Sequence, residues 1–452
     1  MTLRQILLLT HDVVGEHMAG SGIRFWEFAR VLDQHFDVTL ATAPLGQERV
    51  PESVVGPGTV RIWRGSSASE LSRLVQRADV IVASGPLVAM YPFLAASGKP
   101  LVVDCYDPFL LTGLQQHRHR PMSERWVRHE RYRVAHVQGL RAADLVLCAS
   151  ERQKDYWLGM LSALGRINPS IHAEDAAFSS LVRVVPFGLP GQPPQHTCPA
   201  LKGVWPGIGD GDKVVLWNGG IWDWFDAETA VRAMALIAEV RQDVRLFFMG
   251  QARPNATVSR PASVADVIRL SEELGLLDRY VMFHDWVPYQ DRQNYLLEAD
   301  VGISLHEPSA EVRFSFRTRL LDCVWAALPV VATEGDVLGE ELAVAGLAHL
   351  VAPRDPRAVA TAILTVLDAE SNRDDSRARA EPLRARYRWT DASQPLIDFC
   401  KSPRVAPDKK RMRGVRVVPR RRLGSWLPPR LREAMNRNAF ARFWLERRSQ
   451  SR

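Results

Sequence analysis

Two arginines and an aspartate lie close together in the stretch from Phe314 to Asp336, and their chemistry suits a phosphorylated ligand. Arg317 and Arg319 fall just before and at the start of an apolar helix, and Asp322 follows them. A helix N-terminus presents free backbone N–H groups and a partial positive charge, and two guanidiniums add bidentate donors for phosphate. A carboxylate one turn further along can accept hydrogen bonds from ribose hydroxyls. The segment therefore predicts a nucleoside diphosphate site; the alternative is an ordinary buried helix with basic residues on a solvated rim.

The same stretch resembles the donor-sugar signature of the family 4 retaining glycosyltransferases, the glycosyl transferases group 1. In that signature a basic residue and a Glu lie on a helix that is followed by Gly-x-Pro-Val at the start of a strand. Arg319 occupies the position of the diphosphate-binding base and Asp322 that of the ribose-binding carboxylate. Leu328–Val330 match the start of the strand, with Ala327 where the family usually has Gly.

The chain departs from the family around the first acidic residue of the signature. The family's Glu-x7-Glu spacing would put its first Glu at Phe314, and the nearest acids are Glu311 and Glu307. Together with His306, these acids are candidate donor-sugar contacts, and Thr318 is assigned to the same donor site. For His306 alone, a satisfied surface histidine is the ordinary alternative.

A glycine-rich loop, HDVVGEHMAGSGIRFWEF, separates the first predicted strand from the first predicted helix. Gly20 and Gly22 would let backbone amides approach a ligand closely, and Arg24 lies in the first helical turn. The loop is not a GxGxxG fingerprint, and a flexible surface loop explains it equally well. The resemblance implies that this loop lies near the donor phosphates and the acceptor.

Asp107 follows the predicted strand Leu101–Val103, in the run DCYDPFLL. The family commonly has a His and then an acid here, and Tyr106 stands in the His position. A carboxylate at the carboxyl end of a strand and facing a cleft is a candidate catalytic group. The alternative is that Asp107 begins a turn before Pro108.

The second half opens with VVLWNGGIWDWFDAETA, where the family generally has Gly-Arg and, a few residues later, a Lys on the diphosphate. Gly219 and Gly220 keep the tight turn, but the Arg position is Gly220 and the Lys region is Trp224–Asp226. Two expected cations are therefore missing, and Arg317 paired with Arg319 could compensate for them. Asp226 is predicted to cap the next helix.

Three tryptophans fall near this donor region. Trp222 and Trp224 could stack on a sugar face or pack beneath the loop. Trp286, with Val287, matches the turn that wraps the nucleotide base in the family, and ordinary packing is the alternative. We expect Trp217 to lie in the core.

Short apolar runs alternate with helical patterns along the chain, which predicts parallel sheets with helices on both faces. The expected strands are Gln5–Thr10, Phe36–Ala41, Asp79–Ala83, Pro100–Val103, Leu145–Ala149, Lys213–Trp217, Val244–Met249, Tyr280–Phe283, Val301–Leu305 and Val330–Ala332. The expected helices are Ile23–Leu32, Glu124–Arg141, Glu151–Leu164, Asp226–Val240, Val264–Leu274 and Asp291–Glu298.

A cluster of Pro and Gly between Leu181 and Pro199 marks the best domain boundary. We predict an acceptor-side domain at 1–190, a nucleotide-sugar domain at 191–400 and a basic, partly amphipathic tail at 401–452. The fold class is α/β, and the resemblance implies the GT-B architecture, in which two doubly wound, Rossmann-like domains face a central cleft. Ligands of open parallel sheets bind beyond the carboxyl ends of the strands, which agrees with a site in that cleft.

The 452 residues, with 46% apolar and 24% charged, describe a globular protein, and no apolar run approaches the roughly 18 residues of a membrane helix. The tail holds 17 Lys or Arg and 3 Asp or Glu, a net charge of +14. Since the whole chain is +7, residues 1–400 carry −7. The tail predicts contact with an anionic membrane surface; a flexible extension is the alternative. The acidic body argues against nucleic acid as the partner.

The N-terminus, MTLRQILLLTHD, reads as a first strand, without the charged leader and cleavage site of a signal peptide. Five widely spaced cysteines without metal-ligand pairing predict reduced core thiols. We therefore expect a cytoplasmic protein, peripheral at the inner face of the cell membrane, without a metal site or cofactor.

The resemblance implies retaining transfer of a sugar from a nucleoside diphosphate sugar to a lipid-linked or surface-polysaccharide intermediate. Arg317, Arg319 and the helix N-terminus would stabilise the leaving diphosphate, with Asp107 as the third catalytic candidate. Two alternatives stay open. One is a catalytically weak sugar-nucleotide-binding partner of a membrane glycosyltransferase, and the other is a GT-B sugar-nucleotide epimerase.

Overall fold

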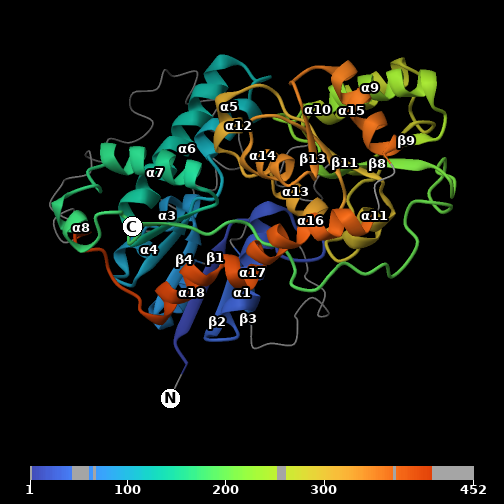
Figure 1. Ribbon diagram of the computed structural model, residues 1–452. Helices are drawn as coiled ribbons and strands as arrows, with labels where there is room; N and C mark the ends of the chain where they lie inside the picture. Colours follow the sequence, from blue (N-terminus) through green and yellow to red (C-terminus); the bar gives the residue numbers. More distant parts are fainter. Residues whose placement is uncertain (1–2, 43–60, 65–67, 252–260, 370–372, 410–452) are drawn as a thin grey trace.

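The computed structural model describes residues 3–42, 61–64, 68–251, 261–369 and 373–409, which form two α/β domains (Figure 1). Residues 410–452, and with them most of the basic tail, lie outside the described residues. No helix in the described ranges is both long and apolar enough to cross a membrane.

The first domain is built on a parallel sheet of seven strands in the order β3-β2-β1-β4-β5-β6-β7. Side chains of one strand alternate between two cores, because successive residues point to opposite faces. Ile6 and Leu8 join one core and Leu7 and Leu9 the other, so both faces are buried, as parallel sheets require. The strands are β1 Gln5–Thr10, β2 Asp37–Thr42, β3 Arg61–Arg64, β4 Val80–Ser84, β5 Leu101–Asp104, β6 Leu145–Cys148 and β7 Val182–Val184. The helices are α1 Gly20–Leu32, α2 Ala68–Arg77, α3 Gly85–Met90, α4 Phe93–Ala96, α5 Phe109–Gln116, α6 Met122–Ala142, α7 Glu151–Ala163 and α8 Pro169–Glu174.

The second domain repeats this plan with six parallel strands in the order β10-β9-β8-β11-β12-β13. Val214 and Leu216 face the core that continues from the first domain, whereas Val215 and Trp217 face a separate core. The strands are β8 Lys213–Gly220, β9 Val244–Gly250, β10 Val281–Phe283, β11 Val301–Ser304, β12 Val330–Thr333 and β13 Ala348–Val351. The helices are α9 Ala227–Val240, α10 Ala262–Glu273, α11 Arg292–Glu298, α12 Ala310–Phe314, α13 Thr318–Ala326, α14 Val337–Val344, α15 Pro356–Asp368 and α16 Arg373–Arg386.

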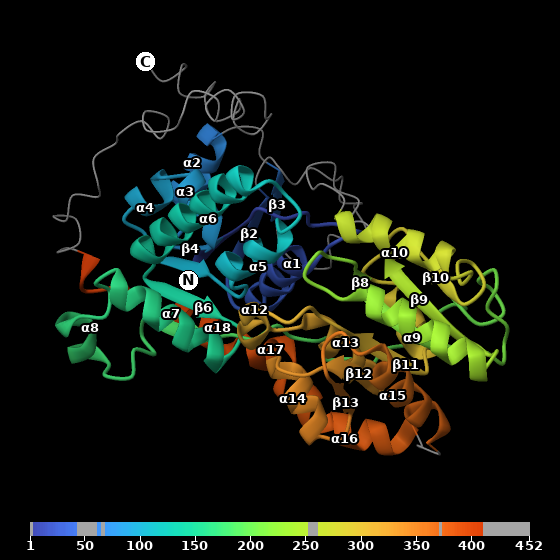
Figure 2. The same cartoon turned by 90° about the horizontal axis from the view of Figure 1, so that it is seen from above.

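Every strand and helix predicted from the sequence is present, with bounds that agree within three residues. The predicted GT-B architecture of two doubly wound domains is confirmed. Figure 2, the view from above, separates the blue and teal first domain from the green to orange second domain.

The chain crosses between the domains twice, and the two crossings lie side by side. Leu189, after β7, accepts a backbone hydrogen bond from Trp389 and donates one to Tyr387. The helices α17 Trp389–Ala392 and α18 Gln394–Lys401 then pack on the first domain. Trp389 contacts the ring of Phe28 on α1, at 5.9 Å between centroids. These two helices follow the second domain in the sequence, but they pack against the first domain.

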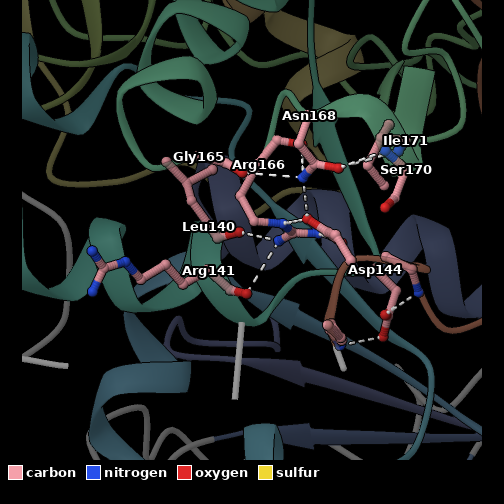
Figure 3. A network of polar contacts seen from close by, with 11 residues as sticks. Leu140, Arg141, Asp144, Gly165, Arg166, Asn168, Ser170 and Ile171 are labelled. Carbon is pink, nitrogen blue, oxygen red and sulfur yellow. Dashed lines mark hydrogen bonds and ion pairs between the residues drawn. The ribbon is translucent and has the colours of Figure 1, made fainter. Parts of the chain in front are cut away.

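A buried polar network fixes the chain where it reaches residue 409 (Figure 3). The guanidinium of Arg166 donates from Nε to Asp408 over 2.7 Å and from Nη1 to the carbonyl oxygen of Leu140 over 2.7 Å. Asp144 accepts hydrogen bonds from the backbone N–H of Ala406 and from Lys409 Nζ. Since Asp144 directly precedes β6, the tail departs from the amino edge of the first sheet, opposite to its carboxyl edge.

None of the five cysteines forms a disulfide. Cys105, Cys148, Cys323 and Cys400 are buried, as predicted. The prediction of core thiols is wrong for Cys198, which is exposed in the segment that leads into the second domain.

Candidate functional site between the two domains

Loops from both domains meet at the carboxyl ends of the two sheets. Gln153 of the first domain donates from Nε2 to the carbonyl oxygens of Tyr106, over 2.7 Å, and of Phe314 in the second domain, over 2.8 Å. Arg118 forms an ion pair of 3.3 Å with Glu307 across the same boundary. The predicted site residues of both domains therefore belong to one region.

Helix α13 begins at this boundary and is held by its apolar face. Leu320, Leu321 and Val324 are buried in the core, and the helix ends at Ala327, which adopts the left-handed conformation with φ +53°. Arg317 is the N-cap residue, so both arginines of the segment lie at the N-terminal end of the helix. Both are buried, at 6% and 8% exposure.

Arg317 has a counter-ion of its own. Its Nη2 donates to Glu311 over 2.6 Å, and its Cζ lies 5.1 Å from the ring centre of Phe225. Its buried Nε has no hydrogen-bond partner among the described residues. The pair is almost fully buried, so one donor of this cation remains to be satisfied.

Arg319 has no carboxylate partner among the described residues. Its Nη2 donates to the carbonyl oxygen of Gly220 over 2.9 Å, and its Cζ lies 3.8 Å from the ring centre of Phe225. Within the described part of the chain, the buried Nη1 has no hydrogen-bond partner. Burial lowers the pKa of Arg319 to about 9, and the positive charge of Arg317 lowers it as well. Arg319 thus remains a buried cation at neutral pH, without a neutralising anion.

The irregular end of β8, at Gly219 and Gly220, turns beside this guanidinium. Gly219 has φ +107°, which favours glycine, and a Cβ there would lie 3.8 Å from Arg319 Nη2. At Gly220, a Cβ would come within 3.1 Å of Trp286 and 3.2 Å of Trp222. Trp286 is half-buried over this turn, so the residue predicted to contact the base lies beside the cation.

The structure also places the other tryptophans of this region and the aspartate predicted to cap the next helix. Trp222 and Trp224 stack on each other at 5.4 Å, and Trp217 is fully buried, as expected. Asp226 caps α9 by accepting from Thr229 N–H, as predicted.

Asp322 is held by a protein cation. Arg292 Nε lies 3.1 Å from its carboxylate, and the same guanidinium stacks on Tyr289 at 3.8 Å. Thr318, in the first turn of α13, is half-buried. A ribose at Asp322 would share the carboxylate with Arg292.

Asp107 faces the Arg317–Glu311 pair from the first domain. Thr112 Oγ1 donates to it over 2.7 Å. Burial raises the pKa of Asp107 to about 7; the charge of Glu311 raises it further, while the Thr112 hydrogen bond and Arg317 lower it. Asp107 is half-buried: protein atoms surround most of the residue, and a part of it remains exposed. The carboxyl group can therefore hold or release a proton near neutral pH.

His306 is buried at 1% exposure, and neither ring nitrogen has a hydrogen-bond partner in the ranges that the structure describes. Burial lowers its pKa to about 3, with a further decrease from the charge of Arg317. Its Nε2 lies 4.0 Å from Asp336, whose pKa burial raises to about 6. The surface-histidine alternative is wrong, because this imidazole is inside the protein and neutral.

Glu307 is engaged by two arginines, Arg118 and Arg354. An open hollow of about 470 Å³ lies next to these residues, at the ends of β11, β12 and β13. Its lining includes His306, Ser309, Arg313, Thr333, Glu334 and Pro353. The hollow could receive a polar group such as a sugar, which would give His306 a partner.

The predicted glycine loop packs against protein atoms. A Cβ on Gly20 would lie 2.5 Å from the hydroxyl of Tyr106, and one on Gly22 would lie 2.0 Å from the carbonyl oxygen of Val13. Arg24, expected near the ligand, is fully buried and forms two 2.9 Å hydrogen bonds to Asp104. The loop places α1 close to β5, and Arg24 is a structural ion pair.

Sequence reasoning missed Asp336, Phe225 and Arg118, all of which contact this region. Asp336 had a local signal, because it follows the end of β12 and caps α14 through Leu338 and Gly339 N–H. Phe225 and Arg118 had none, since their contacts depend on the packing of distant segments.

Residues 212–369 match the model of the family described as Glycosyl transferases group 1, which confirms the resemblance to that group over this part of the chain. No curated protein matches the chain in sequence. The solved structures similar in fold include HepE of Anabaena in complex with UDP-glucose, with TM-score 0.61 and 15% identity over 88% of this chain and 99% of that one. Sucrose-phosphate synthase of Thermosynechococcus elongatus has TM-score 0.59 and 17% identity over 88% and 98%. WaaG, a glycosyltransferase involved in lipopolysaccharide biosynthesis, has TM-score 0.56 and 15% identity over 88% and 100%. At these identities the likeness is one of fold.

Proposed function

We propose that the chain is a glycosyltransferase that takes its sugar from a nucleoside diphosphate sugar. The observation that carries the proposal is the unneutralised guanidinium of Arg319 at the start of α13. A buried charge without a partner is costly, and a diphosphate would supply the missing anion. The family match over 212–369 and the GT-B fold agree with this activity.

The donor would bind across the ends of β8 and α13. Arg319 Nη1 and Arg317 Nε are buried donors without a partner in the described residues, and the first backbone N–H groups of α13 add to them. Trp286 would contact the base, and Asp322 the ribose. The hollow beside His306 would take the sugar. HepE has been crystallised with UDP and UDP-glucose, which makes a uridine diphosphate sugar the first donor to test.

In the reaction, the bond between the anomeric carbon and the diphosphate oxygen breaks, and the diphosphate keeps the electron pair. The acceptor hydroxyl oxygen bonds to the same carbon on the same face, with retention, and its proton passes to the leaving phosphate. Arg317, Arg319 and the N-terminus of α13 stabilise the charge that develops on the diphosphate. This stabilisation comes from protein groups, so we propose metal-independent transfer.

Asp107 would act on the other side of the reacting sugar. It lies on the first domain, faces Arg317 and Glu311, and exchanges a proton near neutral pH. We assign it a contact with the sugar or the acceptor hydroxyl. Closure of the domains around the donor would exclude water and limit hydrolysis.

The acceptor we propose is a lipid-linked or surface-polysaccharide intermediate. WaaG, which has the same fold, is involved in lipopolysaccharide biosynthesis. With such an acceptor the protein would work in the cytoplasm, peripheral to the inner face of the membrane.

A second candidate is a sugar-nucleotide-binding partner without transfer activity. It is favoured by Gly220 and Trp224–Asp226 standing where the family has Arg and Lys. Incubation with UDP-, GDP-, ADP- and dTDP-sugars and a lipid extract, followed by mass spectrometry, separates the two. A glycosylated lipid supports transfer, and donor binding without any product supports the binding partner. Conversion of the donor to its epimer would contradict both.

A further inference from the structure

Helix α7 belongs to the first domain, and its first two turns also contact the second domain. Arg152 forms an ion pair with Glu340 of α14. Tyr156, one turn further along, packs against the ring of Phe314 at 5.1 Å between centroids. Between these two residues lies Gln153, which is fully buried, although a carboxamide side chain is ordinarily exposed. A carboxamide buried at a domain boundary needs hydrogen-bond partners there.

The carboxamide of Gln153 forms three hydrogen bonds, all with backbone groups. Its Oε1 accepts from the N–H of Ala149 over 2.7 Å. Its Nε2 carries two hydrogens and donates to the carbonyl oxygens of Tyr106, over 2.7 Å, and of Phe314, over 2.8 Å. Because an N–H group requires the oxygen and two carbonyl groups require the nitrogen, these partners fix which way the amide faces. One donor hydrogen is thus used in each domain.

The two carbonyl groups belong to the segments that carry the proposed catalytic groups. Tyr106 directly precedes Asp107. Phe314 is the last residue of α12, which carries Glu311, and Arg317 follows three residues later. Glu311 and Arg317 both act on the charge of Asp107, so the side chains of the two segments are close enough to interact. A single nitrogen atom therefore links the backbone before Asp107 to the backbone between Glu311 and Arg317.

We propose that Gln153 is a positioning residue of the transfer reaction, because its carboxamide sets the separation between Asp107 on the first domain and the Arg317–Glu311 pair on the second. It acts through backbone groups, since its own donors are occupied by protein carbonyl oxygens. A misplacement of about 1 Å at a reacting group can lower a rate roughly 100-fold, so the length of this link matters for transfer. The effect on rate rests on the proposed function, whereas the placement of Asp107 does not.

The competing role for Gln153 is an ordinary stabilising contact between the domains. Such a contact would affect unfolding but not the ionisation of Asp107. The pKa of Asp107 is raised to about 7 chiefly by burial, so it reports how closely the protein encloses this carboxyl group. Loosening the link at Gln153 would admit water and lower the pKa towards the ordinary 3.8.

The first test is the titration of Asp107 in the full-length chain, followed by carboxyl ¹³C NMR of aspartate-labelled protein and assigned with Asp107→Asn. Gln153→Met keeps the length of the side chain and removes both donors, and it should move the titration midpoint to lower pH by about one pH unit or more. Arg152→Gln removes the neighbouring ion pair across the same boundary and should leave the midpoint unchanged. An identical midpoint in Gln153→Met and the natural chain would overturn the proposal.

The second test is the release of UDP from UDP-glucose in the presence of a lipid extract. Gln153→Met should lower kcat by about tenfold or more. Its affinity for UDP, measured by calorimetry, should change by less than about twofold, because Arg317 and Arg319 keep their places in the second domain. Gln394→Met, which is exposed on α18, should match the natural chain in both measurements. A loss of UDP affinity as large as the loss of kcat would overturn the proposal, since the substitution would then act on the donor site.

Gln153→Glu separates positioning from a failure to fold, because the new side chain has nearly the same shape. Its ionised carboxylate has no hydrogen to donate and would face two carbonyl oxygens, whereas the protonated form restores one donor. Burial favours the protonated form, so the kcat of this variant relative to the natural chain should rise as the pH falls. A ratio that is the same at every pH would overturn the proposal. If the natural chain releases no UDP, the proposed function fails, and the Asp107 titration still decides the role of Gln153.

Discussion

The Nη2 of Arg319 donates a 2.9 Å hydrogen bond to the carbonyl oxygen of Gly220. Residue 220 is where group 1 glycosyltransferases generally carry the arginine of the β8 turn, so here a guanidinium from α13 reaches the same turn. The helix base and the position of the missing arginine are thus in direct contact, and the compensation by Arg317 and Arg319 stays a prediction.

The buried pair of Arg24 and Asp104 should be important for stability. Asp104→Ala leaves the Arg24 guanidinium, fully buried, with only the carbonyl oxygens of Val185 and Pro186. We expect a loss of about 3–5 kcal/mol, because the remaining charge is uncompensated. Thermal and urea unfolding measure it. Glu124→Ala, which removes the exposed partner of Arg120, should change stability by less than about 1 kcal/mol. Equal effects of the two substitutions would contradict this account.

Replacing Ala327 with glycine should make the protein more stable. It ends α13 with φ +53°, a conformation that costs a residue with a Cβ roughly 1 kcal/mol and that glycine adopts freely. Ala327→Gly should therefore raise the free energy of unfolding by about 0.5–1 kcal/mol. The matched control is Ala235→Gly in the middle of α9, which should lower it by about 1 kcal/mol. A loss of stability at both positions would show that Ala327 is not strained.

Asp107 should make stability depend on pH. Its folded pKa of about 7 lies above the ordinary 3.8, so between these values the folded protein binds a proton that the unfolded chain has released. Stability relative to Asp107→Asn should therefore fall as pH rises from about 4 to 7, and then level off. Melting temperatures across this range measure it.

Thr112→Val sharpens that experiment. The Thr112 hydroxyl lowers the folded pKa of Asp107 by donating to its carboxylate, so its removal should extend the fall to higher pH without changing where it begins. A constant difference between the natural chain and Asp107→Asn at every pH would contradict the raised pKa.

The sequence predicted most of the fold because the central strands are apolar on both faces. It gave no signal for β13, whose residues Ala348 to Leu350 are half-buried or exposed, or for the short edge strand β3. An edge strand needs fewer apolar residues, so its pattern resembles that of a loop.

The placement of the candidate site residues was predicted in part. Arg317 and Arg319 lie at the start of α13 as predicted, because a helix start can be read from local pattern, and their role in binding stays a prediction. The roles of Arg24 and His306 could not be predicted, since their burial results from segments far apart in sequence. Asp104 lies 80 residues from Arg24, and Asp336 lies beyond the next strand from His306.

The ordered packing of residues 403–409, at the end of the described chain, should depend on Asp408. Asp408→Ala removes the carboxylate from the buried Arg166 and one of the three acceptors of Asn168 Nδ2 (Figure 3). We expect faster hydrogen exchange at residues 403–409 and unchanged exchange in α13. Asp398→Ala, at an exposed position of α18, is the control, and it should leave both segments as they are. Unchanged exchange at 403–409 would show that other contacts hold this segment.

The most direct measurement is calorimetric titration of UDP, and then of UDP-glucose, into the natural chain, Arg319→Ala, Arg319→Lys and Arg269→Ala. Arg319→Ala should weaken binding by about 10- to 100-fold, because charge-assisted hydrogen bonds to the diphosphate contribute about 1.5–3 kcal/mol. The affinity of Arg319→Lys should lie between those two, because lysine keeps the charge but loses the bidentate geometry of the guanidinium. Arg269→Ala should bind as tightly as the natural chain. Equal affinity of Arg319→Ala and the natural chain would contradict the assignment of the donor diphosphate to the start of α13.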